Sequence, residues 1–138
     1  FLGGGNGRAG DMSCYEDPAC HSEWDDVAKG MAKILILNSG LCSGGLIGTY
    51  LNDETPYYYT ANHCVGPESE ANSLTFYFGY QRLTCGGGVS SGTTVFGGAD
   101  LVEAVPNSAD GNTLVMIKSK SLPYQTYLTL SQSWLKIK

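Results

Sequence analysis

His63 is the residue of this sequence best suited to acid–base chemistry, and two cysteines frame it. Cys42 opens one apolar run, Cys64 closes a second, and a polar turn separates the two runs, as in a β-hairpin. A disulfide between the two cysteines would clamp the ends of the hairpin and hold His63 beside the bridge. A histidine fixed at the end of a strand is suited to act as a catalytic base, which must keep its geometry during proton transfer. The alternative is a partly buried histidine with a structural role.

The chain contains five cysteines, which is an odd number: Cys14, Cys20, Cys42, Cys64 and Cys85. So many cysteines are typical of an exported, disulfide-bonded protein, so we expect secretion. One cysteine must be free, join another chain, or pair with a stretch outside this sequence. Neighbouring residues on a strand point to opposite faces. A disulfide therefore explains Cys64 better than a base–nucleophile pair between His63 and Cys64.

A metal site made of Cys14, Cys20 and His21 is an alternative use of the first two cysteines. Their spacing matches no standard zinc module, so we expect no metal and interpret His21 as an exposed loop residue. The run Gly86-Gly87-Gly88 lacks the lysine and the strand-to-helix context of a phosphate-binding loop. We therefore expect no cofactor.

Composition favours a single all-β domain. The chain has 138 residues, and its 19 glycines, with plentiful serine, threonine and tyrosine, suit short strands joined by many turns. The formal net charge of -5 argues against nucleic acid or an anionic membrane surface as a partner. No apolar run approaches the roughly 20 residues of a membrane span.

The hydrophobic pattern predicts several short elements besides the hairpin. Residues 22–29 carry Trp24 and Val27 at helical spacing and are expected to form one helical turn. Residues 67–73 are predicted to be an acidic loop, and residues 86–98 a stretch rich in turns. The expected strands are residues 32–37, 74–80, 101–105, 114–117 and 124–130.

Several motifs resemble one known family. The run Cys42-Ser43-Gly44-Gly45-Leu46-Ile47, followed by Thr60-Ala61-Asn62-His63-Cys64, resembles the histidine region of trypsin-like serine proteases. The longer form T-P-Y-Y-Y-T-A-N-H-C is most similar to the secreted bacterial lysyl endopeptidases. The stretch S-C-Y-E-D-P-A-C resembles the amino-terminal segment of that group, and F-Y-F-G-Y-Q-x-x-x-C also resembles the secreted bacterial branch.

The resemblance implies roles for named residues. It implies that His63 is the general base, that Cys42 pairs with Cys64, and that Cys20 pairs with Cys85. It leaves Cys14 without a partner in this sequence. In the family an aspartate before an apolar strand orients the histidine, and the matching position here is Asp110. The sequence has one residue more after that aspartate than the family usually has, and Asp-Gly-Asn is also an ordinary turn. Asp100 is the alternative, although its position between a Gly-Gly turn and a strand suggests a structural role.

The fold implied is one closed, antiparallel, six- to seven-stranded barrel, the first of a two-barrel endopeptidase. We expect a flexible leader at residues 1–12, the barrel at residues 13–118, and a linker with the start of a second barrel at residues 119–138. The chain would then be the amino-terminal half of the enzyme. Its partners would be a polypeptide substrate and a carboxyl-terminal half, or a second chain bound through Cys14.

The nucleophile is the missing part of this interpretation. No Gly-Asp-Ser-Gly stretch occurs, so the serine, the oxyanion hole and the specificity pocket are expected on another segment. The chain alone should not hydrolyse peptides by the triad mechanism. A second hypothesis is a protease-like barrel that has lost its chemistry and acts as a binding or scaffold module.

Overall fold

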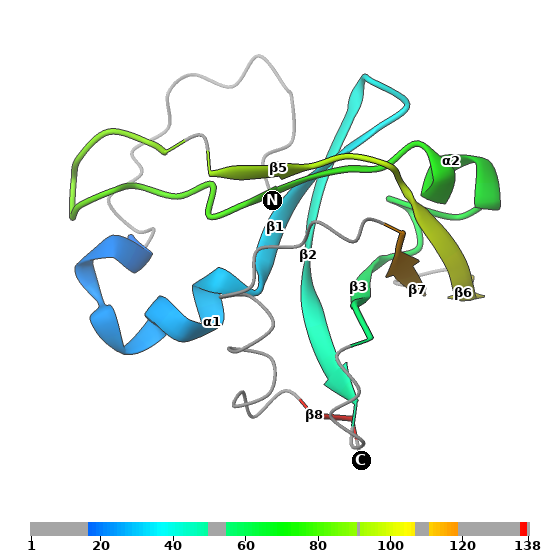
Figure 1. Cartoon of the computed structure of the whole chain (residues 1–138), viewed down its shortest axis with the longest axis horizontal. Helices are drawn as coiled ribbons and strands as arrows, with labels where there is room; N and C mark the ends of the chain where they lie inside the picture. The colour runs from blue at the N-terminus through cyan, green and yellow to red at the C-terminus, as the bar shows by residue number, and fades with distance from the viewer. Residues whose placement is uncertain (1–16, 50–54, 91, 107–110, 119–135, 138) are drawn as a thin grey trace.

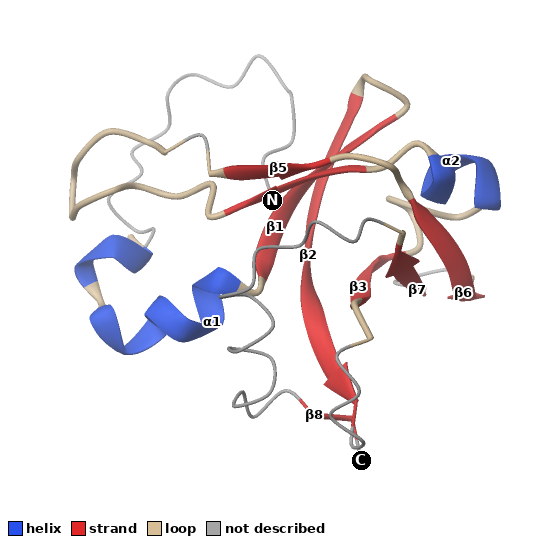
Figure 2. Cartoon of the chain, in the orientation of Figure 1, coloured by secondary structure: helices blue, strands red, loops and turns tan. Residues whose placement is uncertain are grey.

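A mainly antiparallel sheet with short helices at its margins forms the protein (Figures 1 and 2). The computed structural model describes residues 17–49, 55–90, 92–106, 111–118 and 136–137. The helical elements are η2 (Pro18–Cys20), η3 (Ser22–Trp24), α1 (Asp25–Lys29) and α2 (Glu68–Asn72). The strands are β1 (Met31–Ile36), β2 (Gly40–Thr49), β3 (Tyr57–Ala61), β4 (Thr75–Phe78), β5 (Thr93–Val95), β6 (Ala99–Val105), β7 (Asn112–Ile117) and β8 (Lys136–Ile137). The all-β prediction is confirmed.

The sheet is open, whereas a closed barrel was expected. Its strand order is β5-β4-β1-β2-β3-β7-β6, and β8 adds a short parallel pair at the end of β2. Within the described residues, β5 and β6 lie at the two ends of this order and do not pair with each other. Closure needs two edges that can form a ladder. Here β5 has only three residues, and β6 carries a register shift between Leu101 and Glu103.

The core follows from the two-residue period of the strands. In β1, Ala32, Ile34 and Ile36 are buried, and they alternate with residues that are more exposed. Tyr58 of β3 and Phe76 of β4 meet edge-to-face at 5.0 Å between ring centroids. Both side chains are fully buried. This cluster holds β1, β3 and β4 together.

Two elements differ from the sequence expectation. The predicted acidic loop at residues 67–73 contains α2, whose Ala71 is fully buried. The Glu70 carboxylate accepts a hydrogen bond from the main-chain amide of Gly66 at 2.9 Å and fixes the approach to this helix. The turn-rich stretch 86–98 contains β5, which forms because Val95 pairs with Phe76 of β4. The expected strand at residues 124–130 lies outside the described residues.

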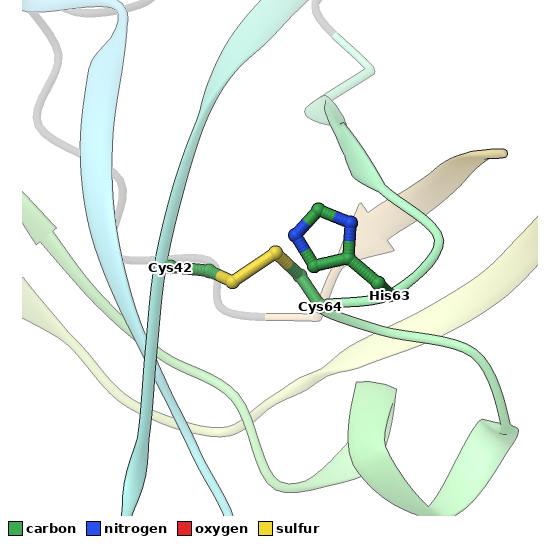
Figure 3. A group of neighbouring side chains, drawn as sticks. All are labelled: Cys42, His63 and Cys64. Carbon is green, nitrogen blue, oxygen red and sulfur yellow. A yellow bond between two sulfur atoms is a disulfide. The ribbon is translucent and has the colours of Figure 1, made fainter. Parts of the chain in front are cut away.

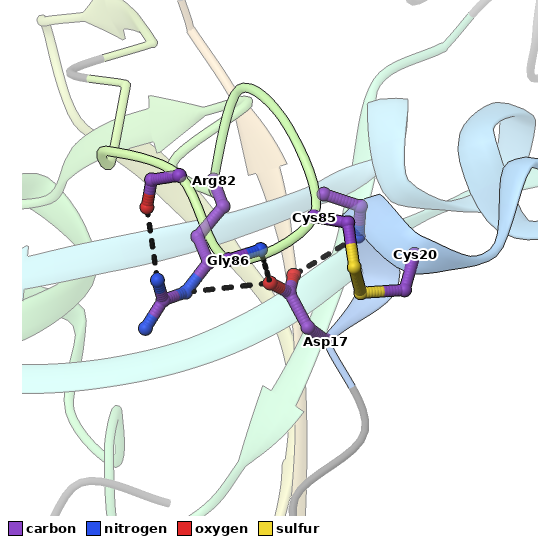
Figure 4. Close-up of polar contacts among 7 residues, drawn as sticks. Asp17, Cys20, Arg82, Cys85 and Gly86 are labelled. Atoms are coloured by element: carbon purple, nitrogen blue, oxygen red, sulfur yellow. Dashed lines mark hydrogen bonds and ion pairs between the residues drawn. A yellow bond between two sulfur atoms is a disulfide. The ribbon is translucent and has the colours of Figure 1, made fainter.

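The amino-terminal helices are attached to the sheet region by one disulfide and a set of polar contacts (Figure 4). Cys20 is bonded to Cys85, 65 residues away in the sequence. The Asp17 carboxylate accepts a hydrogen bond from the amide of Gly86 at 3.1 Å and lies 3.4 Å from Nε of Arg82. The Gly86 amide, with these neighbouring groups, holds the pKa of the Asp17 carboxyl below its usual value. The predicted helical turn at residues 22–29 is present here as η3 and α1.

Candidate active site

His63 lies in the turn that follows β3, and its side chain is exposed. The adjacent Cys64 is bonded to Cys42 of β2, with 6.1 Å between the two Cα atoms. Figure 3 shows the imidazole ring beside this disulfide. His63 and Cys64 occupy a turn and not a strand, so the alternation of strand faces, which was expected to separate their side chains, does not apply to them. The disulfide itself is present, and it is the pair that the resemblance implied.

Main-chain hydrogen bonds fix the turn on both sides of His63. The amide of Cys64 donates to the carbonyl of Ala61 at 3.0 Å, which closes the turn. The amide of Asn62 donates to the carbonyl of Gly111 at 2.6 Å, which joins the turn to the segment that leads into β7. The main chain around His63 is therefore fixed by hydrogen bonds both to the end of β3 and to the segment that leads into β7.

The side chain of Thr113 in β7 forms hydrogen bonds to residues on both sides of His63 in the sequence. Its hydroxyl donates to the carbonyl of Val65 at 2.6 Å and accepts from the side-chain amide of Asn62 at 3.1 Å. Thr113 and Val65 are fully buried. Sequence reasoning missed this residue. The available signal was weak: one hydroxyl within an apolar strand pattern.

The start of β7 also bears on Asp110, the predicted orienting carboxylate. Asp110 itself lies outside the described residues. Gly111, the next residue in the chain, accepts the hydrogen bond from Asn62, the residue just before His63. Asn112 pairs with Ala61 at the end of β3. The described backbone therefore brings the residue after Asp110 into contact with the His63 turn.

Asp100, the alternative carboxylate, has another partner. Its Oδ1 lies 3.0 Å from Nζ of Lys118, whose ammonium also donates to Asn72. Asp100 pairs with Met116, four residues along β7 from Asn112. Four residues of strand span about 13 Å, so Asp100 lies toward the far end of β7 from the His63 turn. Its described ionic contact is the pair with Lys118.

Within the described residues, no hydrogen bond or ion pair joins the imidazole of His63 to an acidic side chain. The amino-terminal metal site, which was considered as an alternative, has few ligands among the described residues. Cys20 is engaged in its disulfide and offers no thiolate, and Cys14 lies outside the described part of the chain. The imidazole of His21 is partly exposed, and its Nδ1 lies 3.4 Å from the Glu23 carboxylate.

A groove of about 650 Å³ lies between the amino-terminal helices and β1. Its walls include Trp24, Val27, Met31, Lys33 and Tyr80. The ammonium of Lys33 lies 4.3 Å from the ring centroid of Tyr80. Because the lining does not include His63, this groove is no part of the candidate active site.

None of the helices in the described ranges is long and apolar enough to cross a membrane.

One protein-family model matches residues 7–134, and its description is lysyl endopeptidase, C-terminal domain. The match spans nearly the whole chain and agrees with the resemblance seen in the histidine and cysteine motifs. It corrects one expectation, which placed the chain in the amino-terminal half of the enzyme. The motifs locate the histidine relative to an expected serine. They carry no information on what precedes this region in a longer protein.

Proposed function

The chain belongs to the family of lysyl endopeptidase C-terminal domains, and we propose that it supplies the histidine and the aspartate of a secreted serine endopeptidase site. In this mechanism His63 takes the proton of a serine hydroxyl as the serine attacks the peptide carbonyl. It then returns the proton to the leaving amine, while Asp110 fixes the imidazole tautomer and stabilises the imidazolium.

The contact between the His63 turn and the start of β7 is the observation that carries this proposal. The hydrogen bond from the amide of Asn62 to the carbonyl of Gly111 joins the residue before His63 to the residue after Asp110. A catalytic base and its orienting carboxylate must lie within about 3 Å in the working enzyme. The Cys42–Cys64 disulfide adds the rigidity that a base needs.

The serine belongs, in this proposal, to polypeptide outside residues 1–138, because the sequence contains no Gly-Asp-Ser-Gly stretch. We assign residues 13–118 to the histidine-bearing unit and residues 119–138 to the linker toward the nucleophile segment. Cys14 would bond to that segment. Secretion is supported by the two disulfides, which are rare in reduced compartments.

A phosphonate probe directed at activated serine tests the proposal on the natural assembly and on the isolated chain. We expect labelling of the assembly on the partner segment and none within residues 1–138. Replacing His63 by alanine should abolish detectable labelling, because loss of the triad histidine costs around a millionfold in rate. His21→Ala is the matched control and should label normally. Labelling of a serine within this chain would contradict the proposed division of the site.

The second candidate is a binding or scaffold module without chemistry. The observations that favour it are the irregular sequence after Asp110, which has one residue more than the family usually has, and the lack of a Gly-Asp-Ser-Gly stretch in this sequence. A correctly folded assembly, free of propeptide, that shows no labelling would make this candidate the better account. Labelling that disappears in His63→Ala would exclude it.

A further inference from the structure

We propose that reduction of the Cys42–Cys64 disulfide converts the region around His63 into a binding site for a thiophilic divalent cation such as Zn²⁺ or Cd²⁺. The ligands would be the two thiolates and the imidazole of His63. One ligand atom from each of these residues already lies within 4.8 Å of the other two. Metal binding needs only this chain, and only its consequence for catalysis rests on the proposed function.

The donor set matches the coordination chemistry of such a cation. Two sulfurs and one imidazole nitrogen form the set that occurs in catalytic zinc sites with an open fourth position. Bond lengths of about 2.3 Å to sulfur and about 2.0 Å to nitrogen place tetrahedral ligands roughly 3.5 to 3.8 Å apart. The disulfided sulfurs must separate to reach this spacing. With 6.1 Å between the Cα atoms of Cys42 and Cys64, side-chain rotation can supply that movement.

The surrounding backbone does not depend on the disulfide alone. On one side, Cys42 is paired with Ile34 of β1 within a six-residue register. On the other side, the turn keeps its hydrogen bonds from Cys64 to Ala61 and from Thr113 to Val65. These bonds hold the three ligands near one another after the covalent bond is broken. The reduced site is therefore largely preformed.

The conversion is balanced with a dithiol as the reductant. The dithiol transfers two electrons and two protons to the disulfide, which gives two cysteine thiols and the oxidised dithiol. Binding of the cation then displaces both thiol protons, since the metal takes thiolates. The imidazole binds in its neutral form through a ring nitrogen. In the proposed enzyme, a His63 bound to metal could no longer accept the serine proton.

The chain provides an internal comparison at its other disulfide. Cys20 and Cys85 are bonded, and His21 directly follows Cys20, so the same residue types are available there. Within the described residues, only Cys42, His63 and Cys64 bring three such ligand atoms together. The Nδ1 of His21 lies 3.4 Å from Glu23 instead. Selective metal binding at Cys42, His63 and Cys64 therefore depends on how these residues are placed and not on the residue types alone.

The test titrates the reduced full chain with Co²⁺, with Cys14→Ser in every variant so that this cysteine adds no ligand; the thiols of Cys20 and Cys85 are controlled by their own double variant. We expect one equivalent to produce thiolate-to-metal charge transfer and tetrahedral visible absorption, and Zn²⁺ to displace it. Loss of an outer-sphere partner weakens metal binding 10- to 100-fold. Removal of a direct ligand in His63→Ala should therefore raise the Kd by about a hundredfold or more, whereas His21→Ala should leave it unchanged. The double variant C42S/C64S should lose the spectrum, and C20S/C85S should keep it.

Equal Co²⁺ affinity in His63→Ala and His21→Ala would overturn the proposal, and so would binding that survives in C42S/C64S. If reduction loosens the fold, near-UV circular dichroism spectra recorded with and without metal test the proposal. Metal should then restore the signal in the parent chain but not in His63→Ala, and equal or absent restoration refutes the site. The assay uses neither substrate nor nucleophile. Metal binding without phosphonate labelling of the assembly would refute the proposed function alone, and labelling without metal binding would refute this inference alone.

Discussion

Replacing Thr113 by valine tests whether this hydroxyl supports the His63 turn. Valine has nearly the same shape as threonine, so the change removes two hydrogen bonds without opening a cavity. The hydroxyl donates to the carbonyl of Val65 and accepts from the side chain of Asn62. After the substitution, the Val65 carbonyl is left buried without this partner.

The expected loss of stability follows from these two bonds. A typical hydrogen bond contributes a net of about 1 kcal/mol, and an unsatisfied buried polar group costs about 1 to 3 kcal/mol. The Asn62 amide is only partly buried and can recover water. We therefore expect Thr113→Val to lower the free energy of unfolding by about 2 to 4 kcal/mol. A domain with about 5 to 15 kcal/mol of stability remains folded after this loss.

Thr60→Val is the matched control, because Thr60 pairs with Thr113 across β3 and β7. It is also nearly buried, but its hydroxyl makes one bond, to the carbonyl of the exposed residue Ser43. Water can replace that bond, so the control should lose only about 0.5 to 1 kcal/mol. Urea unfolding followed by circular dichroism measures both variants, with slopes compared to verify that the unfolded state is unchanged.

Two results would refute this reasoning. Equal destabilisation by the two substitutions would show that the double bonding of Thr113 has no special weight. A loss below about 0.5 kcal/mol would show that the Val65 carbonyl finds another partner. In either case the rigidity of the His63 turn would have to come from the disulfide and the main-chain bonds alone.

Three further predictions concern other parts of the protein. Gly44→Ala should destabilise the protein by about 1 to 3 kcal/mol in urea unfolding, because its Cβ would collide with a main-chain oxygen of β3; Gly88→Ala, with open space around its Cβ, should be nearly neutral. Burial raises the pKa of the Tyr58 hydroxyl. The protonated hydroxyl therefore contributes its full stabilisation of the folded state below about pH 10, and this contribution is lost as the pH rises further. Tyr58→Phe should therefore make alkaline unfolding less steep in pH, and an unchanged slope would contradict this. The pKa of Asp17 is lowered, first of all by the amide of Gly86, so this bond is present above about pH 4 and is lost as the pH falls through the lowered pKa. Hydrogen exchange of that amide by NMR, corrected for intrinsic pH dependence, should lose its protection in acid, and constant protection would count against the bond.

The strands could be predicted where one face of the sheet is apolar. Residues such as Ala32, Ile34 and Ile36 repeat with the period of a strand, and they form the buried face of β1. The helix α2 could not be predicted in this way, because five residues are too few to show a helical period. It depends on contacts distant in sequence, above all the burial of Ala71.

The candidate site was predictable only in part for a related reason. His63 stands in a recognisable sequence context, and so do the cysteines that form the two disulfides. Thr113 contacts Val65 across 48 positions of sequence, and nothing local distinguishes it from any other threonine in a strand. The prediction of a closed barrel was wrong because closure depends on how two edge strands meet. Local sequence patterns do not show how distant strands meet.

The carboxylate of Glu68 has a consequence for how copies of this protein behave together. Within the described residues, β6 forms one edge of the open sheet, and free edge amides invite strands from neighbouring molecules. The Oε2 of Glu68 accepts a hydrogen bond from the amide of Leu101 at 3.0 Å, in the middle of that edge. Next to it, the irregularity between Leu101 and Glu103 interrupts the register that an incoming strand would need. The helix α2 therefore occupies one of the edge amides that a strand from a neighbouring molecule would need, a role separate from any part it plays in the fold.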